Sequence, residues 1–173
     1  MDDLIIYSST DGQTKKICET IKENLTSGNK FQLISLDEAL YFNLEKCEKI
    51  IIGASIRYGR HNKKVLDFII KNKNILKLKK TAFFSVNVVA RKEEKSTAET
   101  NPYILNFLKK TNWKPNKLSV FAGKVDYPNY NFINRNVIRF IMKITKGPTD
   151  INNSYEFTNW ENVRKFAKEV ENL

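Results

Sequence analysis

The sequence predicts an α/β fold in which a five-stranded parallel sheet lies between two layers of helices. Short apolar runs alternate with amphipathic stretches along the chain, which is typical of a three-layer α/β/α sandwich. The 173 residues suit one compact domain, and no repeat or low-complexity linker divides them. We therefore expect residues 1–173 to form a single domain with the strand order 2-1-3-4-5.

The first predicted strand is the apolar run from Leu4 to Tyr7. Ile17, Ile21 and Leu25 then recur at every fourth residue, which predicts a helix with Gly28 as its C-cap. Together these two elements form the opening strand–helix pair of the sheet.

Two more strands and a helix follow. Residues 31–36 read as the second strand, and residues 49–55 as the third. The third strand is almost continuously apolar, which suits a central position in a parallel sheet. Val65, Phe68 and Ile69 then have the spacing of a buried helix face.

The second half of the chain repeats the alternation. Residues 81–89 predict the fourth strand and residues 118–122 the fifth. Between them, Asn101 and Pro102 have the order of an N-cap and a first helical residue.

A closing helix is expected at the far end of the chain. Thr158 and Glu161 have the spacing of a capping box. An apolar stripe follows from Trp160, Val163, Ala167 and Val170. This helix completes the second layer over the sheet.

The segment of about residues 124–158 interrupts the simple alternation, and loops of this length usually have structure or function of their own. Basic residues within it recur at helical spacing: Arg135, Arg139, Lys143 and Lys146. Apolar residues gather on the opposite side: Ile133, Val137, Phe140, Ile141 and Ile144. The pattern predicts a basic amphipathic helix in an insert after the fifth strand.

Composition restricts the function only in part. The net charge of +11 favours an anionic partner such as a phosphate-bearing ligand, a nucleic acid or a membrane surface. However, a chain rich in Lys, Asn and Ile is equally well explained by an AT-rich genome. No nucleic-acid-binding motif is present, so we expect no nucleic-acid partner.

Two further classes of protein are not expected: membrane-spanning proteins and metalloproteins. No apolar run approaches the roughly 20 residues of a membrane-spanning helix. Cys18 and Cys47 lack CxxC or metal-ligand spacing, which predicts no metal site and a reducing, cytosolic environment. No feature of the sequence sets an oligomeric state.

The strongest local motif lies between the first strand and the first helix, and it comprises Ser9, Thr10, Asp11, Gly12, Gln13 and Thr14. Hydroxyl groups, a glycine and the free N–H groups of a helix N-terminus together form a cradle for a phosphate. Ordinary helix capping would favour similar residues. Asp11 would repel a phosphate unless its carboxylate points away or caps an amide.

Other nucleotide motifs are absent from the sequence, which has neither GxGxxG nor GxxxxGK[ST]. Neither cysteine is followed by the arginine of a cysteine-phosphatase loop. We therefore expect flavin mononucleotide (FMN), bound at the carboxyl ends of the strands. The strand ends contribute the remaining candidate cofactor-binding residues: Ser55, Ile56, Arg57, Tyr58, Gly59, Phe84, Ser85, Val86 and Asn87. Among them, Tyr58 is the candidate to stack on the flavin ring.

Four motifs together indicate a family. They are DGQT at 11–14, IGASIRYG at 52–59, SVN at 85–87 followed by VARK at 89–92, and Tyr127-Pro128 with the basic helix after it. In these motifs the chain resembles, over nearly its whole length, the flavodoxin-like, quinone-dependent protoporphyrinogen IX dehydrogenases of bacterial haem biosynthesis. Ordinary flavodoxins share the first loop but not the other three motifs.

The resemblance implies a flavodoxin-like fold and an oxidoreductase that converts protoporphyrinogen IX to protoporphyrin IX. Electrons would pass through FMN to a membrane quinone, either menaquinone or ubiquinone. The resemblance also implies a peripheral protein on the cytoplasmic side of the cell inner membrane. No side chain demands a catalytic role, so catalytic residues are left unassigned.

A flavodoxin that carries single electrons in solution is the alternative interpretation. Such carriers are usually acidic, which lets them dock on basic partners, whereas this chain is basic. The charge therefore favours the dehydrogenase.

Several residues have both a structural and a functional interpretation. His61 is expected at a solvated helix start rather than as a proton carrier, and Cys18 in the packing of a helix. Arg57 and Arg91 either meet porphyrin carboxylates or form surface ion pairs. Three aromatic residues either anchor the insert or pack against a flat macrocycle: Tyr127, Tyr130 and Phe132.

Overall fold

The structure is a computed structural model and describes residues 3–26 and 30–173. Five parallel strands form the central sheet in the order β2-β1-β3-β5-β6, which confirms the predicted order. Their bounds are β1 (Asp3–Ser8), β2 (Phe31–Ser35), β3 (Lys49–Arg57), β5 (Lys80–Asn87) and β6 (Lys117–Ala122). The predicted cap at Gly28 lies outside the described residues.

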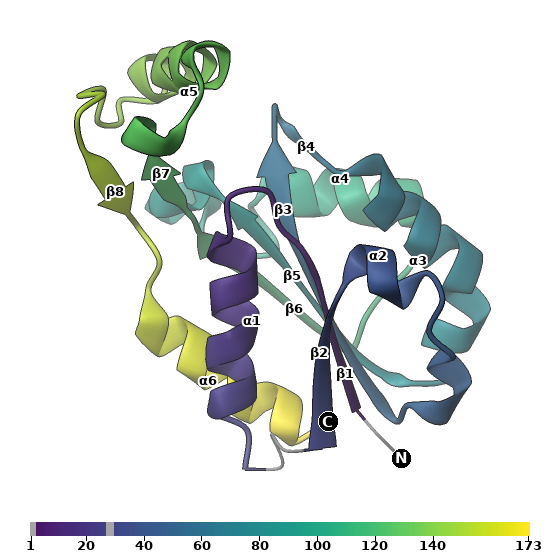
Figure 1. Ribbon diagram of the computed structural model, residues 1–173. Coiled ribbons are helices and arrows are strands. Elements are labelled where there is room, and N and C mark those ends of the chain that lie inside the picture. The colour runs from purple at the N-terminus through teal and green to yellow at the C-terminus, as the bar shows by residue number, and fades with distance from the viewer. Residues whose placement is uncertain (1–2, 27–29) are drawn as a thin grey trace.

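Helices cover both faces of this sheet, as Figure 1 shows. On one face lie α1 (Gln13–Glu23) and α6 (Trp160–Glu171). On the other lie the short α2 (Leu36–Ala39), α3 (Lys63–Leu76) and α4 (Pro102–Thr111). Short 3₁₀ turns complete the layers: η2 (Leu44–Lys46), η3 (Val88–Arg91) and η4 (Glu93–Lys95). Among the described helices, none has the length and apolar content needed to cross a bilayer.

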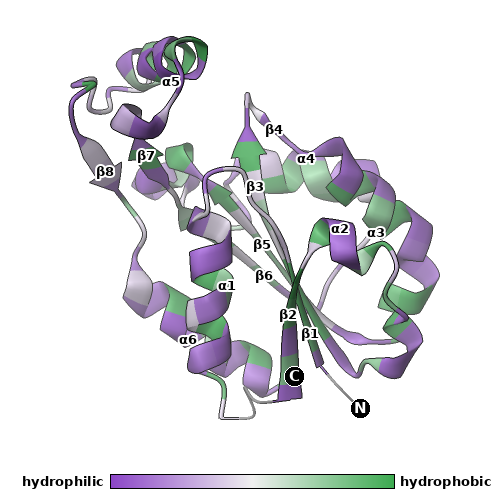
Figure 2. Ribbon diagram, viewed as in Figure 1, coloured by the Kyte–Doolittle hydropathy of each residue, from purple (hydrophilic) through white to green (hydrophobic). Residues whose placement is uncertain are grey.

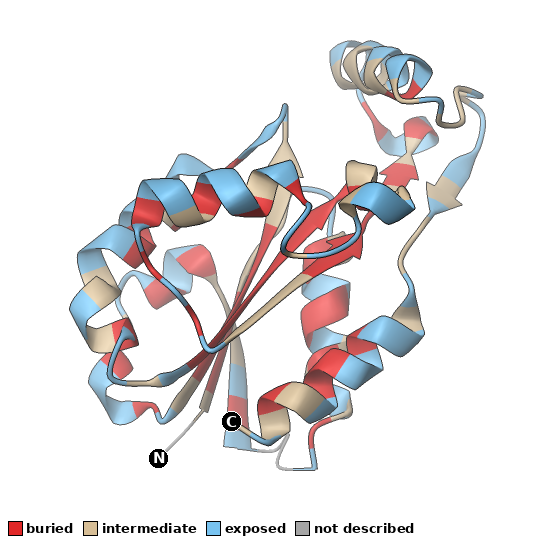
Figure 3. Ribbon diagram, turned by 180° about the vertical axis from the view of Figure 1, so that it is seen from behind, coloured by how far each residue is buried: buried red, intermediate tan, exposed pale blue. Residues whose placement is uncertain are grey.

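Each face of the sheet has its own apolar core, and Figure 3 shows the buried residues running along the strands. Successive residues of a strand point to opposite faces. Phe83 therefore stacks on Phe107 of α4 at a ring-centre distance of 4.1 Å. Phe84 points to the other face, where it meets Phe121 and Phe166. The two cores fix the sheet and both helix layers.

Side-chain caps decide where two strands end. Strand β2 stops at Ser35, one residue earlier than expected, because Ser35 and Glu38 form a capping box that starts α2. Strand β5 stops at Asn87, whose Oδ1 accepts a hydrogen bond from the N–H of Ala90 at 3.1 Å. The predicted extension of this strand to Val89 is therefore wrong.

The start of the closing helix also differs from the prediction. Asn159 caps α6 by accepting a hydrogen bond from the N–H of Asn162. The Thr158 hydroxyl instead donates to the carbonyl of Ala122 and accepts from the Gln13 amide. The expected capping box is absent because Thr158 joins the helix start to β6 and α1.

A two-residue strand, β4 (Arg60–His61), pairs antiparallel with the end of β3 and was not predicted. Tyr58 and Gly59 connect the two strands with φ values of 49° and 77°. Positive φ at both positions is typical of a type I′ hairpin turn. We call Arg57, Tyr58, Gly59 and Arg60 the β3–β4 turn.

The insert forms a small unit beyond the carboxyl ends of the strands (Figure 1). Strands β7 (Lys124–Asp126) and β8 (Ser154–Glu156) pair antiparallel, and between them lie η5 (Tyr127–Asn129) and α5 (Phe132–Ile144). Its own core contains Val125, Tyr127, Tyr130 and Met142. The amphipathic helix is confirmed, but Lys146 lies past its end with a φ of 55° and does not belong to its basic face.

Candidate functional site

A pocket opens at the carboxyl ends of β1, β3 and β5, and the insert forms part of its wall. We call it the main pocket. Predicted residues from the loop after β1 and from the ends of β3 and β5 line it. The insert adds Tyr130, Ile138, Ile141 and Met142. The site is thus assembled from segments that lie far apart in the sequence.

The loop after β1 presents a free helix N-terminus to this pocket. Gly12 is the N-cap of α1, with a φ of 84°, and so supplies no capping side chain. Its own N–H donates to the Ser9 hydroxyl at 3.0 Å, which closes the loop. The next N–H groups of α1 have no partner within the helix and carry its positive dipole end. An anion is the ligand that such a terminus binds.

Thr14, in the first turn of α1, gives independent evidence for a ligand. Its side chain lines the main pocket and is 1% exposed, yet its Oγ1 has no hydrogen-bond partner among the described residues. Buried polar atoms are nearly always paired, because an unpaired one costs about 1–3 kcal/mol. A phosphate oxygen beside the first turn would pair this hydroxyl, so the loop fits a phosphate group.

The sequence left the role of Asp11 open, and the structure gives its partner. Asp11 Oδ2 accepts a hydrogen bond from Arg57 Nη1 at 2.6 Å, in an ion pair. The guanidinium of Arg57 also lies 5.4 Å from the ring centres of both Tyr58 and Tyr130. The carboxylate is therefore balanced by a cation, which removes much of its repulsion of a phosphate.

The β3–β4 turn is joined to the insert across the pocket mouth. The Tyr58 hydroxyl donates to Asn134 Oδ1 on α5. Together with the contact between Arg57 and Tyr130, this bond ties the turn to two parts of the insert. The aromatic and aliphatic wall that results suits a flat heteroaromatic ring.

The comparisons with known proteins agree with this architecture. Residues 4–152 match the family model described as a flavodoxin domain. The chain belongs to the flavodoxin domain family. Oxidised flavodoxin 1 from Bacillus cereus has a similar structure, with a TM-score of 0.54, 16% identity, and coverage of 98% of this chain and 97% of that one. At that identity the similarity concerns the fold alone.

Closer relatives of this flavodoxin domain are enzymes. Protoporphyrinogen IX dehydrogenase [quinone] of Leishmania major is 40% identical over 168 residues, which are 96% of this chain and 73% of that protein. The protein of the same name from Escherichia coli K12 is 37% identical over 174 residues, covering 100% of this chain and 96% of that protein. The match extends through the insert as well as the sheet.

The structure brings together most of the residues predicted to bind the cofactor. All of them line the main pocket except Gly12, Phe84 and Ser85. Phe84 does not line the pocket: its side chain is fully buried in the core under α6, deeper along β5 than Val86, which shares its face and reaches the pocket. Gly12 acts through its backbone, and the contacts of the other residues with FMN remain predictions.

Ser85 belongs to a buried polar chain behind the pocket. His61 Nε2 lies 3.0 Å from Ser85 Oγ, which also accepts a hydrogen bond from Asn87 Nδ2. Asn87 Oδ1 in turn accepts from Asn101 Nδ2 on α4. These hydrogen bonds fix the end of β5, where Asn87 lines the main pocket.

The prediction of a solvated His61 is wrong. The side chain is only 5% exposed and packs edge-on against Phe83 and Phe107. Burial, with a further contribution from the Lys110 cation, lowers the pKa of His61 to about 4. The ring is therefore neutral near pH 7. The unpredicted strand β4 explains the error, since it turns His61 onto the covered face of the sheet.

Three of the other residues with two interpretations have structural roles, whereas Arg57 and Tyr130 line the main pocket and Phe132 is exposed. Cys18 is buried in α1, as expected, and burial raises the pKa of its thiol. Arg91 Nη2 donates to the carbonyl and hydroxyl oxygens of Thr145, so it anchors the end of the insert helix. Tyr127 is fully buried and donates to the carbonyl of Pro148 at 2.8 Å. Arg91 therefore ties the insert to the end of β5, whereas Tyr127 joins two parts of the insert itself.

Sequence reasoning missed part of the pocket wall. Tyr103 on α4 and the residues of the insert reach the pocket only through tertiary packing. The aromatic residues after Asp126 were the one signal for the insert's contribution. No cluster of three or more potential metal ligands occurs within residues 3–26 and 30–173.

Proposed function

We propose that this protein is an FMN-dependent dehydrogenase that oxidises protoporphyrinogen IX to protoporphyrin IX and passes the electrons to a membrane quinone, menaquinone or ubiquinone. The observation that carries the proposal is the full-length similarity, at 37–40% identity, to enzymes of that name. The main pocket supports it, because a phosphate cradle and an apolar wall occur side by side. Such a role belongs to haem biosynthesis.

Named residues of the pocket suit the parts of FMN. The N–H groups at the start of α1 and the hydroxyls of Thr10 and Thr14 would hold the phosphate. The end of β5 and the β3–β4 turn would flank the ring. When bound, FMN supplies a two-electron acceptor that exchanges electrons with both substrates.

The chain itself supplies positioning and the exclusion of water. Ile138, Ile141 and Met142 close one side of the pocket with apolar surface. His61, the only histidine, is neutral and held by Ser85, so it serves the shape of the site. No side chain is assigned as a proton carrier.

The decisive experiment combines purified FMN-loaded protein, protoporphyrinogen IX and a soluble quinone analogue without oxygen. We expect porphyrin fluorescence to rise only when protein, FMN and quinone are all present. Flavin loading without porphyrin formation would contradict the dehydrogenase and leave the soluble electron carrier as the function.

A second experiment tests the phosphate cradle. The native protein is expected to bind FMN more tightly than riboflavin, because only FMN has a phosphate for Thr14 and the helix N-terminus. Replacing Thr10 and Thr14 together by Val should weaken FMN binding and leave the far-UV circular dichroism unchanged. Fluorescence titration of both flavins measures this, and equal affinities in the native protein would exclude the cradle.

We also propose a peripheral location on the cytoplasmic surface of the inner membrane. Four apolar side chains of α5 are 64–74% exposed: Phe132, Ile133, Phe140 and Ile144. Figure 2 shows hydrophobic segments along this helix, which stands away from the sheet. Arg135, Arg139 and Lys143 belong to the same helix. Apolar side chains beside cations suit an anionic lipid surface.

A further inference from the structure

A second hollow lies beside the main pocket, on the side of the β3–β4 turn that faces α3 and α4. We call it the side hollow. Apolar residues Leu66 and Ile70 line it together with the cations Arg60, Lys63 and Lys110. Thr10, Ser55, Arg57 and Tyr58 line both this hollow and the main pocket. The two spaces are therefore neighbours across one shared wall.

The side hollow has an excess of positive charge. Its single carboxylate, Asp67, pairs with Lys63 at 3.1 Å. Arg60 and Lys110 have no ion-pair partner in the part of the chain that the structure describes. Lys110 also contributes to the low pKa of the neighbouring His61. An anionic ligand would relieve this unbalanced charge.

Its apolar lining restricts what kind of anion fits. Ile70 is 51% exposed and Leu66, one helical turn before it on α3, is half-buried, so both offer apolar surface to the hollow. A small inorganic anion would leave this surface uncovered. An apolar molecule with carboxylate groups would use both the aliphatic surface and the cations.

We infer that the side hollow binds the propionate side of the tetrapyrrole substrate, with Arg60 and Lys110 facing its two carboxylates. The inference rests on the proposed function. It follows from the shared wall, since a macrocycle held there extends toward the main pocket, where the electron acceptor would lie. Arg57 is left out of this role because Asp11 already pairs with it.

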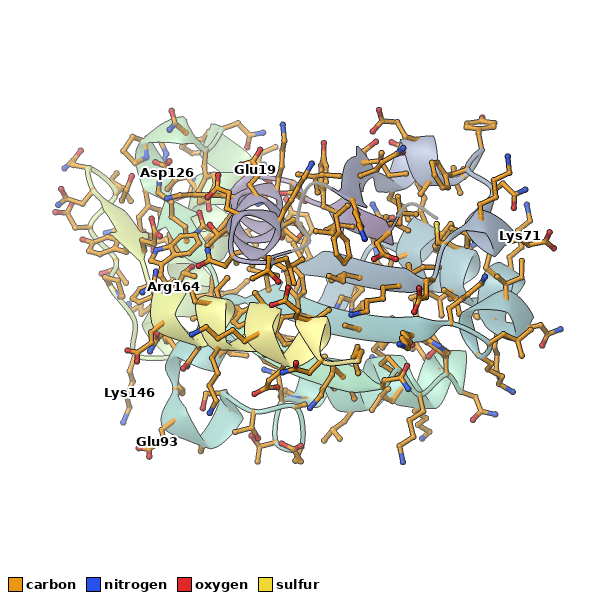
Figure 4. The ribbon with its side chains drawn as sticks, turned by 90° about the horizontal axis from the view of Figure 1, so that it is seen from below. Glu19, Lys71, Glu93, Asp126, Lys146 and Arg164 are labelled. Atoms are coloured by element: carbon orange, nitrogen blue, oxygen red, sulfur yellow. The ribbon has the colours of Figure 1, made fainter. Side chains whose placement is uncertain are left out.

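The test compares two double variants. Arg60→Gln with Lys110→Gln removes both unpaired cations of the hollow. The control, Lys109→Gln with Arg164→Gln, removes the same two residue types from exposed positions outside it: Lys109 precedes Lys110 on α4, and Arg164 lies on α6 (Figure 4). All proteins are FMN-loaded, and equal flavin content is checked first.

Binding of protoporphyrin IX and of its dimethyl ester is measured by porphyrin fluorescence. The native and control proteins should bind the free acid at least about tenfold more tightly than the ester, because only the acid has carboxylates for the cations. The Arg60/Lys110 variant should lose this preference. Equal affinities in the native protein, or an unchanged preference in the Arg60/Lys110 variant, would overturn the inference.

Turnover separates this inference from the proposed function. If the native protein oxidises protoporphyrinogen and the Arg60/Lys110 variant has the same KM, the carboxylate site is wrong and the dehydrogenase stands. A raised KM with nearly unchanged kcat supports the site. If the native protein neither binds porphyrin nor oxidises porphyrinogen, both proposals fail.

Discussion

At the scale of single residues, Gly12 is the position at which the phosphate loop depends most on residue type. Its φ of 84° is left-handed, and a Cβ placed there would meet nothing within 4 Å. Replacing Gly12 by another residue is therefore unfavourable because of backbone strain, and not because the new side chain would be crowded within the loop. The strain is greatest for β-branched residues and least for Asn.

We expect Gly12→Val to abolish FMN loading and Gly12→Asn to retain much of it. The flavin absorbance of the purified proteins measures loading, and far-UV circular dichroism shows whether each variant is folded. A Gly12→Val protein with normal FMN content would contradict the loop geometry.

The buried His61 predicts how the stability of the protein depends on pH. Its pKa is about 4 in the folded protein and 6.5 ordinarily, so the unfolded chain binds its proton first as the pH falls. The free energy of unfolding should therefore decrease from pH 6.5 toward pH 4, by up to about 1.4 kcal/mol per pH unit from this group. Above pH 6.5 its contribution is constant.

Urea denaturation between pH 6.5 and 5 tests this in the native protein and in His61→Gln, which can bond to Ser85 but does not titrate there. The variant should have the smaller slope. The titration of Asp126 does not contribute to the slope in this pH range. Hydrogen bonds from Lys124, Ser154 and Asn129 lower its pKa to about 2, so its contribution is lost only below its ordinary value of 3.8. Equal slopes in the two proteins would rule out a neutral, buried His61.

At the scale of elements, α5 is the helix whose outer surface the fold leaves uncovered. Only Met142 of this helix is fully buried. Because the helix ends at Ile144, its basic residues are Arg135, Arg139 and Lys143. Each cation near an anionic lipid surface contributes about 1 kcal/mol.

Changing these three residues to Glu should sharply reduce sedimentation with anionic liposomes and slow electron transfer to membrane quinone. FMN binding should not change. The control reverses three exposed cations on α6: Arg164, Lys165 and Lys168. If both triple variants lose liposome binding equally, the effect comes from total charge, and α5 is no specific docking surface.

At the scale of the whole molecule, the insert leaves the sheet domain and returns to it at one place. Strand pairing sets Lys124 opposite Glu156, and the N–H of Phe157 bonds to the carbonyl of Gly123. The chain therefore enters and leaves the insert at nearly the same point. Among residues 124–158, all of which the structure describes, Phe157 alone packs against a core of the sheet, and it lies where the chain leaves the insert.

Replacing residues 125–155 by a two-residue Asn-Gly turn should leave a folded domain with a cooperative unfolding transition. FMN should bind more weakly, because the apolar wall from α5 is gone while the phosphate loop remains. Circular dichroism and flavin titration check these outcomes. Loss of the folded domain would mean that the insert is part of its stability.

Part of the site was predictable because it is local. A strand, a turn and a helix that follow one another place Ser9 to Thr14 at the carboxyl edge whatever the rest of the chain does. The partners of these residues were not predictable. Asp11 meets Arg57 across 46 positions of sequence, and His61 meets Ser85 across 24.

The sequence by itself determined the alternation of strands and helices, the phosphate loop and the amphipathic helix of the insert. Each follows from periodicity or from neighbouring residues, whose spacing the backbone fixes. Tertiary structure alone decided that His61 is buried, that Arg57 neutralises Asp11, and that the insert walls the pocket. Those features depend on which surfaces meet after folding, and residue spacing along the chain does not encode them.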